Sequence, residues 1–390
     1  MTLPTKNRIE SIDLLKGIVM VVMALDHTRD YFHAAAFFYD PSNPEVTSVP
    51  IFLTRWITNF CAPVFCFLAG LSAYFVGRRK NTNALSIFLL KRGLWLVFIE
   101  FTVVNFSWFF DVQFESPGLL VIWALGVSML VLAALVHLPK YAILTYSCLL
   151  IFGHNLLDPI HFEGNVWWSI LHELQFYSFS NGNKFYVIYP IIPWIAVMSL
   201  GYCFGELYQP SVEPAKRKQI LNALGVASIV LFIILRSINQ YGDPVPWTAY
   251  KTSIQTFMSI LAATKYPPSL CYLLMTLGPA FIFLANSENL KGRVINFFSM
   301  FGRVPFFYYI IHIFLIHGLA LIAAELTGFG WESMILSDWV VQVPTLKGYG
   351  FRLWVVYAVW VAVIAALYPF CKRFDAYKMN NRDKGWLSYF

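Results

Sequence analysis

The chain has 390 residues, of which 58% are hydrophobic and 13% charged, and its formal net charge is +7. Soluble domains carry about 25% charged residues, so this composition provides too little polar surface for a water-soluble globule. The basic residues fall in short loops between apolar stretches, where membrane topology and anionic lipid account for them, and this distribution argues against nucleic-acid binding.

Ten apolar stretches, each near the length that crosses a ~30 Å hydrocarbon core, predict ten membrane spans. In chain order they lie near residues 13–37, 53–76, 90–107, 118–137, 140–154, 185–207, 219–238, 268–286, 304–325 and 351–371. The polar start Met1–Glu10 precedes an apolar run that is too long for a signal peptide and has no small-residue cleavage site, so the first span is expected to stay in the mature protein. The expected fold class is all-α: a polytopic integral membrane helical bundle of about ten transmembrane helices that forms a single domain over residues 1–390.

Loops rich in Lys and Arg alternate with loops that are poor in both, and this alternation predicts the orientation of the spans. The basic loops contain Arg78, Arg79, Lys80, Lys91, Arg92, Lys216, Arg217, Lys218, Lys291, Arg293 and the tail from Lys372 to Lys384. These loops are expected to be cytoplasmic, and so are both termini. The opposite set, near residues 38–52, 108–117, 155–184, 239–267 and 326–350, is expected to face outward.

Two of the outward segments are too long to be plain turns. The first contains Trp168 and His172 among other aromatic and polar residues, and the second contains Asp243 in a Gly-Asp-Pro turn. One interpretation is an interfacial aromatic belt with turns. The other is a lid over an outward-facing site, in which aromatic faces and polar groups bind a sugar.

Ionisable residues inside the first span demand an explanation, because each costs roughly 2.5–3.5 kcal/mol to place in lipid. Asp26, Asp30 and His33 recur at i, i+4 and i+7, and His27 lies one turn from Asp30. A carboxylate beside an imidazole is the arrangement that orients a general base. A polar helix end that emerges into water is the alternative, which fits His27 less well because His27 lies deeper and follows an apolar run.

Further polar residues lie in other spans: Arg55, Asn59, Glu100, Asn105, His312 and His317. Interhelical hydrogen bonding would explain any one of them. Together they predict the lining of a polar cavity. Counting the helical rise from the span ends places His27, Asn59 and His317 in one layer of the membrane, with His312 deeper toward the cytoplasm.

The six cysteines are scattered on or beside apolar spans without a CxxC pair, so neither a disulfide framework nor a zinc site is expected. They are expected to be small core residues, and no metal is expected. The sequence also lacks a Walker loop, a dinucleotide-binding glycine pattern and a serine-nucleophile elbow.

The N-terminal run from Arg8 to Gly17 (RIESIDLLKG), continued by Met23–His27 (MALDH), resembles the opening helix of the transmembrane acyltransferases. It is most similar to the bacterial proteins grouped with heparan-α-glucosaminide N-acetyltransferase. The resemblance extends over nearly the whole chain, through Thr54–Trp56, Phe60–Pro63, Phe67–Gly70, Tyr189–Trp194, Tyr241–Pro244, Thr264–Ser269 and Gly302–Pro305 with His312. Lys16 stands where the wider family pattern has Arg, and Asn59 where relatives often carry His or Asp.

The resemblance implies an enzyme of the bacterial cytoplasmic membrane that takes an acetyl or other acyl group from cytoplasmic acyl-CoA. The acceptor would be a glycan or amino sugar on the outer side. His27 is then the expected base, with His33 as its competitor, Asp26 or Asp30 as its orienting group, and His312 or Asn59 as a polarising or positioning group. Direct transfer is preferred to an acetyl-histidine intermediate, although the sequence does not decide between them.

The expected acceptor-binding residues are Arg55, Asn59, Asn105, His317, Trp168, His172 and Asp243. The cations available to the CoA phosphates are Arg78, Arg79, Lys80, Lys91, Arg92, Arg293 and Arg303. The sequence leaves open whether the protein forms a homodimer.

Two other functions remain open from the sequence. A proton-coupled transporter would also carry intramembrane Asp, His and Arg. However, the chain shows neither an internal repeat nor paired interrupted helices in matching halves, as inverted-repeat transporters tend to do. A catalytically silent scaffold for envelope assembly is the third possibility.

Overall fold

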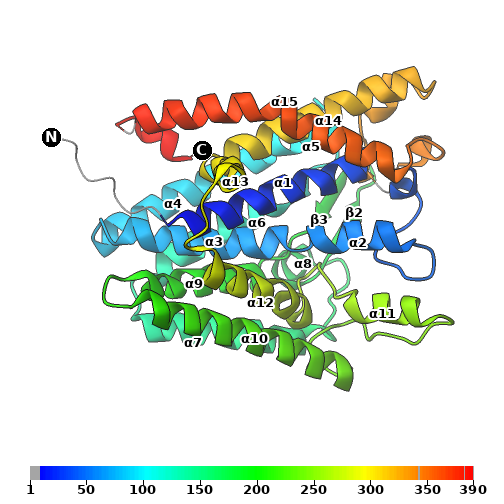
Figure 1. The fold of residues 1–390 in the computed structure, drawn as a ribbon. Helices are drawn as coiled ribbons and strands as arrows, with labels where there is room; N and C mark the ends of the chain where they lie inside the picture. Colours follow the sequence, from blue (N-terminus) through cyan, green and yellow to red (C-terminus); the bar gives the residue numbers. More distant parts are fainter. Residues whose placement is uncertain (1–8, 341–342, 382, 390) are drawn as a thin grey trace.

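The computed structural model describes residues 9–340, 343–381 and 383–389, so Arg8 of the N-terminal run lies outside the described residues. Long helices lie side by side in one bundle, and α1 (Glu10–Phe32) runs through its interior (Figure 1). α1 contacts α2, α3, α12, α13, α14 and α15. The helix with the most charged groups is therefore surrounded by protein, which lowers the cost of placing those charges in a membrane.

The other α-helices are α2 (Val49–Thr58), α3 (Cys61–Gly77), α4 (Thr82–Ile99), α5 (Asn105–Phe109), α6 (Val121–Leu135), α7 (Lys140–Gly153), α8 (Val166–His172), α9 (Ile192–Phe204), α10 (Pro214–Ile238), α11 (Ser253–Leu261), α12 (Leu270–Ser287), α13 (Arg293–Arg303), α14 (Pro305–Leu326) and α15 (Leu353–Asn380). Short turns of other helix types are η1 (Ala34–Phe37), the π-helix η2 (Glu100–Val104), η3 (His154–Leu157), η4 (Gly205–Tyr208), η5 (Trp331–Met334), η7 (Pro344–Leu346) and η8 (Gly385–Tyr389).

Each of the ten predicted apolar stretches contains a helix, but two of them, 118–137 and 185–207, begin with a β-strand. Residues 185–207 were expected to be helical throughout, but Lys184–Val187 is a β-strand and α9 begins at Ile192. Pro190 explains the late start, because a proline disfavours helical backbone at the residue before it. The prediction missed α13, which precedes α14, and the short helices α8 and α11 in the outward segments.

Five helical stretches among the described residues are long and apolar enough to cross a membrane. They are Val49–Gly77, Pro214–Ile238, Leu270–Ser287, Pro305–Leu326 and Leu353–Asn380. α1 is also long, but its charged residues distinguish it from these five. The chain is thus a mostly helical membrane protein, while the ten crossings and the cytoplasmic termini stay predictions.

A small sheet, which the sequence analysis did not predict, joins two distant segments. Its strands are β1 (Gly118–Leu119), β2 (Gln175–Ser178) and β3 (Lys184–Val187), in the order β1-β3-β2. β3 pairs parallel to β1 and antiparallel to β2. In Figure 1, β2 and β3 lie toward the end of the bundle at which α1 finishes. The sheet thereby ties the 155–184 segment to the start of α6.

Glycines allow helices in the bundle to approach each other until their backbones touch. A Cβ atom added to Gly70 of α3 would lie 1.8 Å from the Met198 carbonyl oxygen of α9, and one added to Gly201 of α9 would lie 2.0 Å from the Phe67 carbonyl oxygen of α3. α1 and α13 meet in the same way at Gly17. Such close crossings are a common way for helices to associate within a membrane.

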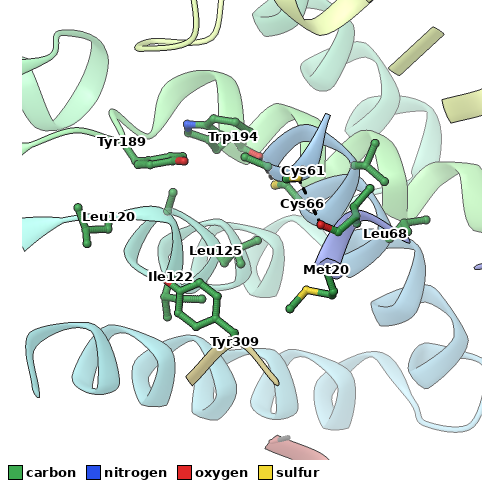
Figure 2. Packing of buried hydrophobic residues seen from close by; sticks show 14 of the residues in the cluster. Met20, Cys61, Cys66, Leu68, Leu120, Ile122, Leu125, Tyr189, Trp194 and Tyr309 are labelled. Atoms are coloured by element: carbon green, nitrogen blue, oxygen red, sulfur yellow. Dashed lines mark hydrogen bonds between the residues drawn. The ribbon is translucent and has the colours of Figure 1, made fainter. Parts of the chain in front are cut away.

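All six cysteines are free, and four of them are buried, so the prediction that they are small core residues is confirmed for those four: Cys61, Cys66, Cys271 and Cys371. Figure 2 shows Cys61 and Cys66 among the buried apolar side chains. The Cys66 thiol donates to the Trp194 carbonyl oxygen at 3.3 Å.

Candidate active site

A cavity of about 220 Å³ lies beside the last turns of α1, and we call it the outer cavity. Its wall includes Asp26, His27, Arg29 and Asp30 of α1. Its other lining residues include members of four connecting segments, at residues 36–41, 188–189, 265–266 and 339–340. These segments belong to the predicted outward-facing loops or directly adjoin them. The position of the cavity therefore fits a site that is reached from the outer side.

Asp26 is the centre of an ion network in this wall. Its carboxylate accepts hydrogen bonds from Arg55 Nη1 at 2.8 and 3.2 Å and from Thr58 Oγ1 at 2.8 Å. Arg29 Nη2 lies 2.9 Å away, one helical turn along α1, and Lys265 Nζ lies 3.8 Å away. A buried carboxylate needs such partners, because isolated charges are costly to bury. Asp26 therefore organises three cations around the cavity and brings the predicted residue Arg55 to its wall.

Arg29 is 4% exposed, and only part of its guanidinium is hydrogen-bonded. Its Nη2 also donates to Asp30 Oδ1 at 2.6 Å. Its Nε and Nη1 atoms are buried and have no hydrogen-bond partner among the described residues. A guanidinium has five N–H donors, and a buried donor that lacks a hydrogen-bond partner costs free energy. Arg29 itself lines the outer cavity, so its guanidinium belongs to the polar wall of that cavity.

His27 contacts His312 directly across the α1–α14 interface. His27 Nδ1 lies 2.8 Å from His312 Nε2, and His312 Nδ1 lies 2.7 Å from the Tyr308 carbonyl oxygen. The carbonyl can only accept, so a neutral His312 carries its proton on Nδ1 and its Nε2 accepts from His27 Nδ1. His27 Nε2 then keeps its lone pair. The hydrogen-bond pattern thus assigns the basic nitrogen of a side chain that lines the outer cavity.

The orienting group of His27 differs from the one expected. The sequence analysis assigned this role to Asp26 or Asp30, but the Asp26 carboxylate is engaged by Arg29 and Arg55, and Asp30 is paired with Arg29. His312, which was expected to lie deeper, instead reaches His27 directly.

His33 has a local structural role. Its Nδ1 accepts a hydrogen bond from the Ala35 backbone at 3.1 Å, and so caps η1 where α1 ends. Its backbone pairs with Phe351. This arrangement corresponds to the polar-helix-end interpretation of the sequence. Of the two competing histidines, only His27 lines the outer cavity among the described residues.

His317 does not line the outer cavity, so the prediction that it shares a cavity with His27 is wrong. Its ring nitrogens lie 3.0 Å from the Ser107 carbonyl oxygen and 2.7 Å from the Met334 carbonyl oxygen. Its ring stacks on Phe110 at a centroid distance of 4.0 Å. The prediction used only the position of each residue along its helix axis and ignored the direction in which its side chain points. Five residues at ~100° each put His317 roughly 140° around α14 from His312, on a different face.

Two other predicted polar residues shape the wall of the cavity from behind. Asn105 donates to the Gly118 carbonyl oxygen at 3.0 Å and accepts from the Gly118 amide at 2.6 Å. Glu100, in the π-helix η2, accepts from the Trp123 amide at 2.6 Å and so caps the first turn of α6. These bonds position the start of α6, where Leu120 and Val121 line the cavity.

Asn59, Trp168 and Asp243 are placed elsewhere. The Asn59 backbone carbonyl accepts from Tyr272 at 2.7 Å, and its side-chain oxygen is buried without a partner among the described residues. Trp168 Nε1 donates to a backbone carbonyl at 2.9 Å. Asp243 accepts from the Thr264 hydroxyl at 2.7 Å. The structure thus gives Trp168 and Asp243 contacts that brace their loops and does not bring them to the outer cavity, while His172 lies in a separate cluster with His154 and Asp158.

A second cavity, of about 130 Å³, lies toward the other end of α1, and we call it the inner cavity. Lys16, Ser72 and Arg92 supply its polar lining, and the remainder is apolar. Lys16 Nζ donates to Ser72 Oγ at 3.3 Å, and Arg92 Nη1 donates to the Ser388 carbonyl oxygen. The step of ten residues from Lys16 to Asp26 separates the two walls by about 15 Å along α1.

Of the other cations predicted to bind CoA, Arg303 is paired with Asp375 at 2.6 Å, whereas Arg78, Arg79 and Arg293 are exposed at helix ends.

The two cavities come close to each other at α6 and α14. Val121 and Tyr309 line the outer cavity, whereas Ile122 and Phe306 line the inner one. The Phe306 and Tyr309 rings are stacked with centroids 6.3 Å apart. Figure 2 shows Ile122 and Tyr309, one from the lining of each cavity, among the buried hydrophobic side chains. A barrier that contains the Phe306 and Tyr309 rings therefore lies between the two cavities, beside the His27–His312 pair.

Sequence reasoning missed several residues of this site. It did not select Arg29 as a donor, Lys265 as a partner of Asp26, or Tyr309 as part of the wall. Arg29 offered a signal, because it lies in a span between two carboxylates. Tyr309 offered none beyond its position one turn from His312.

Comparison with known families accounts for most of the chain. The family model described as "Heparan-alpha-glucosaminide N-acetyltransferase, catalytic" matches residues 8–241, which include the ion network on α1 and α2 and the start of α6. A search of curated proteins finds no match. Since the family match covers more than half of the 390 residues, the chain belongs to the heparan-alpha-glucosaminide N-acetyltransferase catalytic-domain family and is a membrane acyltransferase of that type.

Proposed function

We propose that the protein transfers an acetyl group from cytoplasmic acetyl-CoA to a hydroxyl or amine of a glycan or amino sugar on the outer side of a bacterial cytoplasmic membrane. The observation that carries this proposal is the His27–His312 pair beside the barrier between the inner and outer cavities. A donor and an acceptor that enter from opposite sides would meet at this point.

The inner cavity suits the donor. Its largely apolar lining fits the thin pantetheine arm, and Lys16 and Arg92 provide positive charge at the polar part of the wall. The exposed cations Arg78, Arg79 and Arg293 remain available for the nucleotide phosphates outside the cavity. The thioester carbonyl would then lie near Ile122, at the barrier to the outer cavity.

The chemistry follows from the assignment of the histidine protons. His27 Nε2 takes the proton from the acceptor hydroxyl or amine as its oxygen or nitrogen attacks the thioester carbonyl carbon. The C–S bond then breaks, and the proton on His27 is returned to the departing CoA sulfur. His312 positions His27 by accepting from Nδ1, so the ring presents the correct tautomer.

The outer cavity suits an oxygen-rich acceptor. The Arg29 guanidinium in the cavity wall can donate to sugar oxygens, while the Asp26 and Asp30 carboxylates can accept from hydroxyls or an amine. A transporter for small molecules would need an alternating pathway through the bundle, and membership of an acyltransferase family favours the enzyme.

The test is transfer of radiolabelled acetyl from acetyl-CoA to amino-sugar acceptors by the purified protein in proteoliposomes. His27→Ala should reduce the rate by about 10²–10⁴-fold, the usual effect of removing a general base. His33→Ala is the matched control, because His33 lies on the same helix end but outside the cavity lining. Near-normal turnover by His27→Ala, together with loss of turnover by His33→Ala, would assign the base to His33 instead.

A further inference from the structure

A buried cluster of metal-binding side chains lies apart from both cavities, and we call it the His154 cluster. It consists of His154 in η3, Asp158 directly after η3, and His172 at the end of α8. One potential ligand atom from each residue lies within 4.8 Å of the other two. His154 is 1% exposed and His172 is 3% exposed, so both imidazoles are shielded from water. This cluster was not anticipated from the sequence, which predicted no metal and assigned His172 to sugar binding.

Two of the three distances in the cluster are close to those between ligands around one ion. His154 Nδ1 and His172 Nε2 are 3.3 Å apart, and His172 Nε2 and Asp158 Oδ1 are 3.8 Å apart. Ligands at ~2.0–2.2 Å in a tetrahedral zinc site are separated from one another by roughly 3.4 Å. The third pair, His154 and Asp158, lies within 4.8 Å, so a rearrangement of these side chains would bring the three atoms to bonding distance of a shared cation.

Outer groups hold the ligands in place, as they do around established metal sites. Asn155 Nδ2 donates to Asp158 Oδ2 at 2.7 Å, which leaves Oδ1 directed to the cluster side. Asn155 Oδ1 accepts from the Leu270 amide at 2.9 Å and so fixes this support to α12. The Trp168 ring stacks on His172 with centroids 5.8 Å apart.

Hydrogen bonds alone leave the cluster incompletely satisfied. The two histidines can share only one hydrogen bond, and the 3.8 Å separation between His172 and Asp158 exceeds hydrogen-bonding distance. A divalent cation would satisfy these groups together, because imidazole nitrogens and carboxylate oxygens are both metal ligands.

We propose that the His154 cluster binds one divalent transition metal of the zinc class through His154 Nδ1, Asp158 Oδ1 and His172 Nε2, with a water in the fourth position. Two imidazoles and one carboxylate suit Zn²⁺ better than Mg²⁺ or Ca²⁺, which prefer oxygen ligands. The ion would connect the end of α7 to α8 and thereby brace the outward segment that contains β2 and β3. It lies outside the acetyl-transfer site, so the proposal does not depend on the proposed function.

The experiment uses the full-length protein in detergent, stripped with EDTA and then titrated with ZnCl₂ or CoCl₂. We expect one equivalent of tightly bound zinc by elemental analysis and a higher unfolding temperature after reloading. The Co²⁺ form should show the intense visible ligand-field bands of a four-coordinate site. These readouts require no variant, so they test the site even if a substitution prevents folding.

Variants then assign the ligands. His154→Ala and His172→Ala should each weaken zinc binding by at least 10-fold, whereas His161→Ala should bind zinc normally. His161 is the matched control because it lies in the same segment, pairs with Glu173 and has a side chain that is 67% exposed. Absence of stoichiometric Zn²⁺ and Co²⁺ binding by the stripped protein would overturn the proposal. Binding that survives both His154→Ala and His172→Ala would overturn it too, because the metal would then be adventitious.

Discussion

The contact between α3 and α9 supports a prediction about stability. In Gly70→Ala the new Cβ would lie 1.8 Å from the Met198 carbonyl oxygen, whereas Cβ contacts below 3.0 Å are essentially never observed. The obstacle is backbone, so no side-chain rotation can relieve it. The two helices must therefore separate locally by more than about 1 Å, a gap that forfeits roughly a quarter to a half of each affected dispersion contact.

We expect Gly70→Ala to destabilise the protein by about 3 kcal/mol, at the upper end of the range for overpacking. The assay is thermal unfolding of the detergent-purified protein, followed by the fluorescence of its 13 tryptophans. Gly318→Ala is the matched control, because an added Cβ on this α14 residue meets no heavy atom within 4 Å. That control should unfold at or above the wild-type temperature, since alanine favours helix over glycine by up to ~1 kcal/mol.

A double variant sharpens the test. Gly201 makes the reciprocal contact, with an added Cβ 2.0 Å from the Phe67 carbonyl oxygen. Once Gly70→Ala has separated the helices, Gly201→Ala should cost much less than it does alone, because both act at one crossing. Wild-type stability of Gly70→Ala, or strictly additive losses in the double variant, would refute the close backbone approach.

Three further predictions concern the site and its orientation. Arg29→Lys keeps the positive charge beside Asp30 but loses the planar set of guanidinium donors. The KM for the acceptor should therefore rise by about 10-fold, while the KM for acetyl-CoA changes little. Equal increases in both KM values would contradict a role of Arg29 in acceptor binding. Acetyl-CoA at 100 times its Kd should stabilise the purified protein by ~2.7 kcal/mol in a thermal-shift assay, and the absence of a shift at saturation would favour a transporter or scaffold. Topology reporters fused after Lys80 and at Phe390, a residue outside the described part of the chain, should both give a cytoplasmic signal, and one near Ser169 should give an extracytoplasmic signal. A cytoplasmic signal at Ser169 would refute the ten-span arrangement.

The sequence alone determined the parts of the fold that depend on local composition. Hydropathy located a helix in each of the ten apolar stretches, because the tendency of a continuous apolar segment to leave water depends on the composition of that segment alone. The scattered cysteines were correctly predicted to be unpaired, and the cost of charge in lipid pointed to the end of α1. Sequence reasoning missed the sheet, since β1 and β3 pair across more than sixty residues and each is too short to show a strand pattern.

Only the tertiary structure decided which polar side chains meet. His27 and His312 are 285 positions apart, and their contact depends on how α1 and α14 are rotated about their axes. The rise per residue predicts height along a helix, but a rotation error of one residue turns a side chain by ~100°. For this reason His317 was wrongly assigned to the cavity. The same uncertainty hid the His154 cluster, whose ligands come from η3, the residue after it and α8, which only the tertiary structure brings together.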